Sequence, residues 1–122
     1  MPSIDIKFQK FDEYQNPVFV ASARKSPETY EVLKTYHEKL TAMEIDTFFP
    51  IYCNPEYEYA SIRFMKSDEK RFNSMKPRNV YRVEFSIKQK NKDKKIYVNC
   101  YLKSLKLLTK AEKFDEGEEL EL

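Results

Sequence analysis

Tyrosines and basic side chains alternate with apolar residues in the stretch 79–108, NVYRVEFSIKQKNKDKKIYVNCYLKSLKLL. Residues 80–88 place apolar side chains at the odd positions, and residues 96–103 place them at the even positions. Successive side chains of a strand point to opposite faces, so each run can bury one side and expose the other. If both apolar sides enter one core, aromatic rings and positive charges emerge together on one exposed face. Such a face suits single-stranded nucleic acid, whose bases stack on rings and whose phosphates attract cations.

Two other stretches extend this pattern. Residues 57–65 alternate in the same way, with tyrosine and arginine on the side opposite the apolar residues. Residues 88–95, KQKNKDKK, carry five lysines in eight positions and are predicted to form a basic loop. Residues 66–78 are predicted to form a second polar, basic loop. Lysine clusters neutralise phosphates and release counterions, which gives affinity without sequence choice. The candidate nucleic-acid-binding residues are Tyr59, Arg63, Arg71, Arg82, Lys88, Tyr97, Tyr101 and Lys103.

Charge is distributed in three blocks along the 122 residues, although the net charge is only +2. Residues 1–59 carry 6 Lys or Arg against 10 Asp or Glu, a balance of −4. Residues 60–111 carry 15 against 4, a balance of +11, and residues 112–122 carry 1 against 6, a balance of −5. This asymmetry indicates a middle region that faces a polyanion and a separate acidic tail. The tail could occupy the basic binding surface until nucleic acid displaces it, or it could dock partner proteins.

Each signal also has a structural explanation. The tyrosines could serve as strand formers, the lysines could protect a sheet edge from aggregation, and the tail could aid solubility. All three features together favour binding.

Catalytic and metal-binding patterns are missing from the sequence. It holds no glycine-rich phosphate loop, no HExxH and no GxSxG, so we expect no enzyme and no cofactor. The alternative is an enzyme whose pair of catalytic carboxylates is assembled only in the folded protein. His37 is the only histidine and is expected to pack on a helix. Cys53 and Cys100 form no CxxC pair and read as free, buried thiols of a reducing compartment. No apolar run reaches membrane-spanning length and no signal sequence is evident, so we expect a soluble, intracellular protein without membrane partners.

The elements follow from periodicity and turn residues. Residues 3–24 predict a hairpin with a turn at 12–17, and 27–43 predicts a helix with Ser26 as N-cap. Residues 46–56 read as a packed connection, because Pro50 and Pro55 exclude a central strand. With only one glycine, Gly117, the corners are expected to use Pro, Asn, Asp and Ser.

The predicted fold is therefore mainly β with one α-helix. Five short strands suit a small OB-like barrel or a twisted antiparallel sheet. An OB barrel usually places its helix between strands three and four, whereas the helix here follows the second strand, so either 46–53 hides a strand or 3–24 is misread. Residues 1–108 are expected to form one nucleic-acid-binding domain and 109–122 a flexible acidic tail.

This layout resembles the single-stranded-DNA-binding proteins of viruses and phages. The resemblance covers residues 57–122, through VYRVEFSIKQKNKDKKIYVNCYLKSLKLL and the tail FDEGEELEL. It implies an OB fold that coats displaced DNA during replication and recombination, an acidic tail that contacts replication proteins, and a virus-encoded protein in a host cell. Position by position, the resemblance implies that Tyr97, Tyr101 and the basic residues beside them bind DNA.

The sequence thus predicts a sequence-tolerant single-stranded-DNA-binding protein. Two alternatives stay open. RNA could bind the same surface, because no reader of the 2′-hydroxyl is evident. A protein-interaction module could use the same tyrosines, since Tyr and Arg are enriched in protein interfaces. Self-association is a further option.

Overall fold

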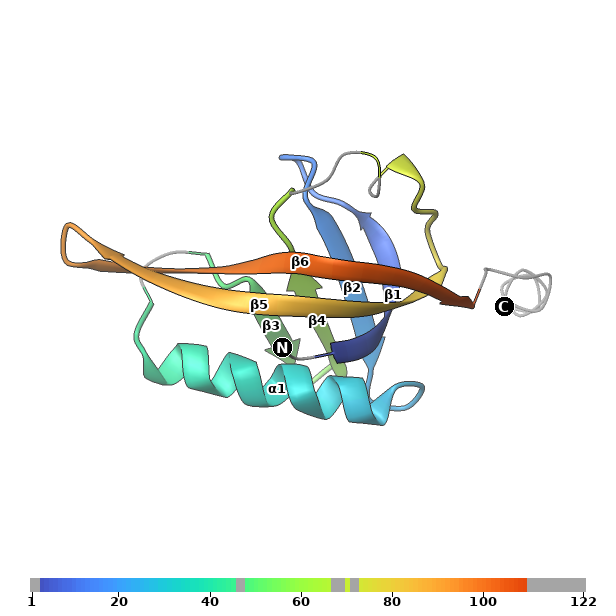
Figure 1. Cartoon of the computed structure of the whole chain (residues 1–122). Helices are drawn as coiled ribbons and strands as arrows, with labels where there is room; N and C mark the ends of the chain where they lie inside the picture. Colours follow the sequence, from blue (N-terminus) through green and yellow to red (C-terminus); the bar gives the residue numbers. More distant parts are fainter. Residues whose placement is uncertain (1–2, 46–47, 67–69, 71–72, 110–122) are drawn as a thin grey trace.

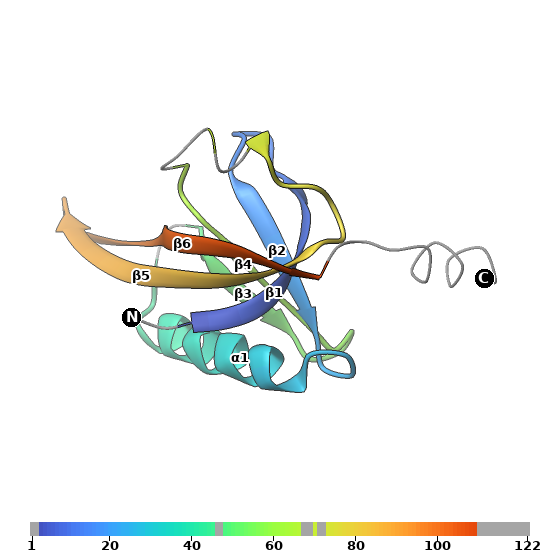
Figure 2. The same ribbon diagram turned by 45° about the vertical axis from the view of Figure 1, so that its right-hand side comes forward.

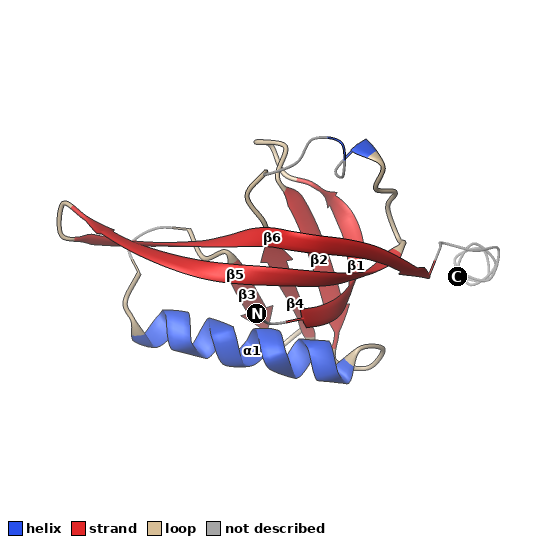
Figure 3. Cartoon of the chain, in the orientation of Figure 1, coloured by secondary structure: helices blue, strands red, loops and turns tan. Residues whose placement is uncertain are grey.

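Six strands and one helix make up the part of the chain that the computed structural model describes, residues 3–45, 48–66, 70 and 73–109. Figure 3 shows that strands dominate this structure. The predicted fold class, mainly β with a single helix, is confirmed, but the strands number six and not five. The elements are β1 (Ser3–Phe11), β2 (Pro17–Ser22), α1 (Pro27–Ala42), β3 (Ile51–Asn54), β4 (Tyr59–Arg63), β5 (Val80–Lys92) and β6 (Lys95–Thr109).

The strands form one antiparallel sheet in the order β3-β4-β2-β1-β5-β6, and this sheet curls into a half-barrel. In Figure 1 the long β5–β6 ribbon crosses in front of β1, β2 and β4. The curl brings β6, at one end of the sheet, back to the chain just after β4. There the backbone N–H of Met65 donates to the carbonyl of Cys100 at 2.9 Å, and Met65 forms a parallel bridge with Tyr101.

Four fully buried phenylalanines fill the half-barrel. Phe8 of β1 lies 5.3 Å from Phe19 of β2, Phe19 lies 5.6 Å from Phe64, and Phe64 lies 5.8 Å from Phe85 of β5, measured between ring centroids. Phe64 and Phe85 belong to segments far apart in the sheet order, so they meet only because the sheet curls. The second and third of these contacts are edge-on, an arrangement that stabilises ring pairs beyond the burial of their surface.

Helix α1 covers one side of the sheet, where it packs mainly against β3 and also against β2 and β4 (Figures 1 and 2). Its buried face includes Tyr30, Leu33 and Leu40, at the predicted helical spacing. Ser26 is the N-cap residue as expected, but its side chain makes no capping hydrogen bond. His37 is half-buried, as predicted, and its Nδ1 lies 3.1 Å from the carbonyl oxygen of Ile51.

The predicted basic loop at 88–95 is wrong. Residues 88–92 continue β5, Lys95 begins β6, and only Asp93 and Lys94 form the turn, both with positive φ (52° and 65°). Two positive φ values match the twist of a two-residue hairpin turn. The lysines are therefore held on a paired ribbon, which projects beyond the body of the protein at the left of Figure 1.

The expected connection at 46–56 contains the short strand β3, so the first of the two options left open by the sequence, a hidden strand in this stretch, is correct. Its prolines explain its place: β3 lies between Pro50 and Pro55 and pairs on one side only, with β4. The hairpin 3–24 is confirmed. Residues 46–47 lie outside the described part.

Asp, Ser and Asn form corners as expected: the side chains of Asp12, Ser22 and Asn54 accept hydrogen bonds from backbone N–H groups two to four residues later. The positions with positive φ are mostly of other types. Of the six non-glycine residues with positive φ, only Asp93 is of an expected type. The others are Gln15, Glu44, Glu58, Arg78 and Lys94. A left-handed conformation costs such residues about 1–2 kcal/mol each, which the surrounding structure must offset.

Across the described residues, no helix is long and apolar enough to cross a membrane. Arg71 and the acidic tail from residue 110 onward lie outside the described part, so the predictions made for them stay predictions.

Candidate nucleic-acid interface

We call residues 88–97 the arm. Its strand register decides which side chains share a face: Lys88 pairs with Asn99, Lys90 with Tyr97, and Lys92 with Lys95. Paired residues of an antiparallel ribbon point to the same side. Four lysines and Tyr97 therefore share one face, the arm face, which continues through Asn99 to Tyr101.

The arm face has a regular spacing. Lys88, Lys90 and Lys92 are all exposed and alternate along β5, so their Cα atoms are about 6.7 Å apart from one to the next. That separation is similar to the distance between successive phosphates of an extended single strand. The opposite face of the arm carries Gln89 and Asn91, and no lysine. Charge on the arm is thus sorted to the side that also bears the tyrosines.

Tyr101 lies where the arm meets the body. The Nζ atom of Lys88 is 5.3 Å from the centroid of its ring, a cation–π contact. Ser86 pairs with Tyr101 across the ribbon, and its buried Oγ has no hydrogen-bond partner among the described residues. A ring, an ammonium group and an unpaired hydroxyl therefore lie together at this point.

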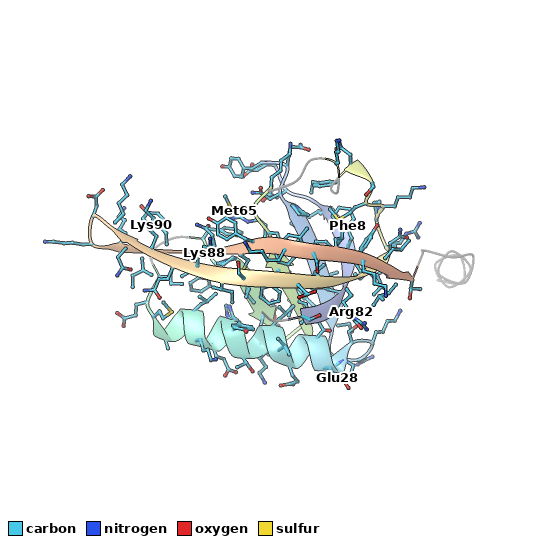
Figure 4. All side chains as sticks on the ribbon, in the orientation of Figure 1. Phe8, Glu28, Met65, Arg82, Lys88 and Lys90 are labelled. Atoms are coloured by element: carbon cyan, nitrogen blue, oxygen red, sulfur yellow. The ribbon has the colours of Figure 1, made fainter. Side chains whose placement is uncertain are left out.

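Arg82 lies toward the other end of β5, away from the arm, as the labels for Arg82, Lys88 and Lys90 in Figure 4 show. Its Nε donates to Oδ1 of Asp5 at 2.8 Å, and this hydrogen bond raises the pKa of the Arg82 guanidinium. Lys103 is exposed and is the extra residue of a β-bulge, because Glu84 pairs with Ser104 and Phe85 pairs with Leu102. The bulge shifts the alternation by one residue.

A groove of about 780 Å³ lies beside the arm face. We call it the aromatic groove; its lining includes Tyr14, Phe48, Tyr52, Arg63, Met65 and Asn99. Phe48 and Tyr52 are 63% and 41% exposed, so both rings are accessible to a ligand. The ring of Tyr52 also lies 6.1 Å from that of Tyr59, so Tyr59 extends the row of rings along the outer face of β3 and β4.

Arg63 is held in place inside this groove. Its Nη1 donates to Oδ2 of Asp12 at 3.0 Å, and its guanidinium carbon lies 3.7 Å from the centroid of the Phe48 ring. Partial burial opposes ionisation of Asp12, but hydrogen bonds from the backbone of Asn16 and from Arg63 outweigh it and hold the pKa of Asp12 below its ordinary value. Arg63 thus supports an aromatic ring, and its charge is balanced by Asp12.

Apart from Lys103, at the bulge of β6, and Arg71, outside the described part, the sequence-predicted residues are distributed over three places. The structure brings Lys88, Tyr97 and Tyr101 together on the arm face. Tyr59 and Arg63 lie on β4, at and beside the aromatic groove, and Arg82 lies at the far end of β5.

Sequence reasoning named the lysines of 88–95 as phosphate contacts but placed them in a loop, so it did not assign Lys90, Lys92 and Lys95 to one face with Tyr97. It missed Asn99, Phe48 and Tyr52. The positions of Lys90 and Lys92 could have been found, because they continue the alternation of residues 80–88. Phe48 and Tyr52 lie in a stretch without clear periodicity, so only the fold reveals them.

The remaining reactive groups lie in the core. Both cysteines are free and buried, as predicted, and burial raises the pKa of Cys100 to about 12. A hydrogen bond with Cys53 and, after it, burial raise the pKa of Tyr30 to about 12. Within the described ranges, no three His, Cys, Asp or Glu side chains are grouped to hold a metal ion.

Comparisons with models of known protein families, with curated proteins and with solved structures find no match for this chain.

Proposed function

We propose that this protein binds single-stranded DNA without strong sequence preference, of the kind that replication and recombination require. The observation that carries the proposal is the register of the arm, which puts Lys88, Lys90, Lys92 and Lys95 on the same face as Tyr97. Phosphates and bases need different partners, and a single strand presents both along its length. A ribbon that alternates cations with rings on one face supports contact with both at once.

Tyr97 and Tyr101 are the proposed stacking platforms. Each is half-buried, so part of the side chain is packed while part of it stays accessible. Base stacking on such rings contributes about 1–3 kcal/mol per base and tolerates any base. The arm lysines then contact the backbone and supply salt-dependent affinity.

Arg63 and Arg82 have smaller roles in this proposal than the arm lysines. Both are paired with carboxylates, Asp12 and Asp5, so a phosphate would have to compete with an existing ion pair. Lys103 is exposed beyond the Tyr101 end of the arm face and can extend the phosphate contacts.

The acidic tail, residues 112–122, has a complementary role in the proposal. Its balance of −5 opposes the arm, where five lysines face one aspartate, a balance of +4. It would compete with DNA for the arm face or bind partner proteins of replication.

The test is fluorescence anisotropy with labelled dT and rU oligonucleotides and a duplex control, at low and moderate salt. We expect tight dT binding, weak duplex binding and a steep salt dependence. Tyr97→Ala and Tyr101→Ala should each weaken binding by about 5- to 150-fold, and the matched control Tyr57→Ala, 71% exposed on a turn, should not. If none of the three ligands binds at low salt, the proposal is wrong. Equal affinity for rU would indicate RNA as a natural ligand.

A protein-binding function is favoured by one observation. Leu107 and Leu108 are 40% and 37% exposed near the end of β6, which is an edge strand. An exposed apolar edge can pair with a strand of another protein. A partner bound there should resist salt, whereas DNA bound to the arm should be released by it.

A further inference from the structure

The aromatic groove is continuous with the arm face. Asn99 belongs to both, because it pairs with Lys88 on the ribbon and also lines the groove. Met65 joins them a second time, since it is bridged to Tyr101 and lines the groove as well. In Figure 4 Met65, on the chain after β4, is labelled close to Lys88 of β5. A strand that follows the arm face toward the body would therefore arrive at this groove.

We infer that the aromatic groove is a base-stacking subsite, in which Phe48 holds one unpaired base of a strand whose neighbouring bases stack on Tyr97 and Tyr101. The inference rests on the proposed function and adds a path for the strand and a second group of contacts. The volume of about 780 Å³ lies in the range of pockets that hold small molecules, so a nucleobase with its sugar can enter.

Phe48 has the features of a stacking platform. Although 63% exposed, its ring is fixed by the guanidinium of Arg63 at 3.7 Å, and Asp12 in turn fixes Arg63. A ring held in one orientation loses little conformational freedom when a base stacks on it. The ion pair below the ring thus prepares the site before the ligand arrives.

Charge in the groove favours a base over a phosphate. Asp12 and Glu13 both line it, against the single arginine that Asp12 already neutralises. A phosphate would be repelled by the carboxylate of Glu13, whereas an uncharged base would not. Asn99 supplies an amide that can donate to and accept from the edge of a base. The phosphates would stay outside, with the lysines of the arm.

The first experiment uses tryptophan as a local reporter, because the chain contains none. In the Phe48→Trp variant, binding of single-stranded oligo-dT should quench the tryptophan emission. An oligonucleotide of the same length with abasic positions should quench much less, because it offers phosphates without bases. The matched control is Tyr57→Trp, in the turn between β3 and β4 and outside the groove lining, where little quenching is expected.

The second experiment measures affinity with Phe48→Ala, in case tryptophan itself alters the groove. On a strand of about 12 nucleotides the variant should lose about fivefold to a hundredfold in affinity, and on a strand of about 4 nucleotides, which the arm alone can hold, it should lose nothing. Tyr57→Ala should match the wild type on both lengths.

The outcomes separate the two proposals. If oligo-dT binds the Phe48→Trp variant by anisotropy but quenches its emission no more than the abasic strand does, the subsite is refuted and the proposed function stands. An unchanged affinity of Phe48→Ala on both lengths, or an equal loss on both, would also refute a separate subsite. If no strand binds the wild type at low salt, both proposals fail.

Discussion

Neutralising the arm face is the strongest test of the DNA-binding proposal. The triple variant Lys88→Gln, Lys90→Gln, Lys92→Gln removes three charges from one face of one strand. All three side chains are exposed, so the fold should be unaffected and thermal unfolding should match the wild type. The matched control is Lys25→Gln, Lys34→Gln, Lys39→Gln, which changes the net charge equally but at and near helix α1.

The size of the effect follows from counterion release. Each phosphate contact to a single strand contributes about 0.7 to the slope of log K against log salt concentration. If each arm lysine makes one contact, the triple variant loses about 2 units of slope. At about 0.1 M salt this corresponds to a loss of about 100-fold in affinity, which shrinks toward nothing as the salt approaches about 1 M.

The assay is the anisotropy titration with oligo-dT, repeated at several salt concentrations for each variant. The control variant should change the slope by well under about 1 unit, because its lysines lie away from the arm. An equal loss for both triple variants would show that only net charge matters and would refute the role of the arm face. An unchanged slope in the arm variant would refute phosphate contact by these lysines.

Three further predictions concern the tail, an ion pair and the core. Ending the chain after Ala111 removes a segment with a balance of −5 and should tighten oligo-dT binding at low salt; unchanged affinity there would contradict competition by the tail. Asp12→Asn should destabilise the protein by about 1–3 kcal/mol at pH 7, measured by urea unfolding, because it removes the charge partner of Arg63. The pKa of Asp12 is lowered in the folded state, so the stabilisation by its carboxylate is complete above the ordinary pKa of 3.8 and is lost as the pH falls through the folded-state pKa. A stability difference between variant and wild type that persists undiminished at about pH 2 would argue against the carboxylate as its origin. Phe85→Ala should destabilise the protein by about 3–5 kcal/mol in the same assay, because the ring is fully buried against Tyr36 and Phe64. A loss below about 1 kcal/mol would show that the Phe85 ring is not tightly packed in the half-barrel.

The sequence by itself determined the elements and their faces. Alternation in 80–88 and 96–103 correctly predicted that Tyr81, Val83, Phe85, Val98, Cys100 and Leu102 are buried. It could do so because burial on one face of a sheet imposes a period of two, which is a local property of the chain. The helix was predicted to within one residue at its end for the same kind of reason, since its N-cap and apolar spacing are local signals.

The hairpin 3–24 was predicted from the sequence, but the register of β5 and β6 and the order of the strands in the sheet were decided only by the tertiary structure. No local sequence signal distinguishes a basic loop from the basic end of a hairpin. The arm at 88–97 is therefore defined only by the register in which β5 and β6 pair. The bulge at Lys103 is a further case: it brings Leu105 opposite Val83 and Leu107 opposite Tyr81, a change of phase that the pairing with β5 makes visible.

The aromatic groove belongs wholly to the tertiary structure. Tyr14, Phe48 and Asn99 come from three distant parts of the chain, and they meet because the sheet curls and β6 returns to the chain after β4. Periodicity reports which side of a strand is buried, but it carries no information on which distant strand faces it. The composition of the surface could thus be predicted from the sequence, whereas the continuity of arm and groove depends on the closure of the half-barrel.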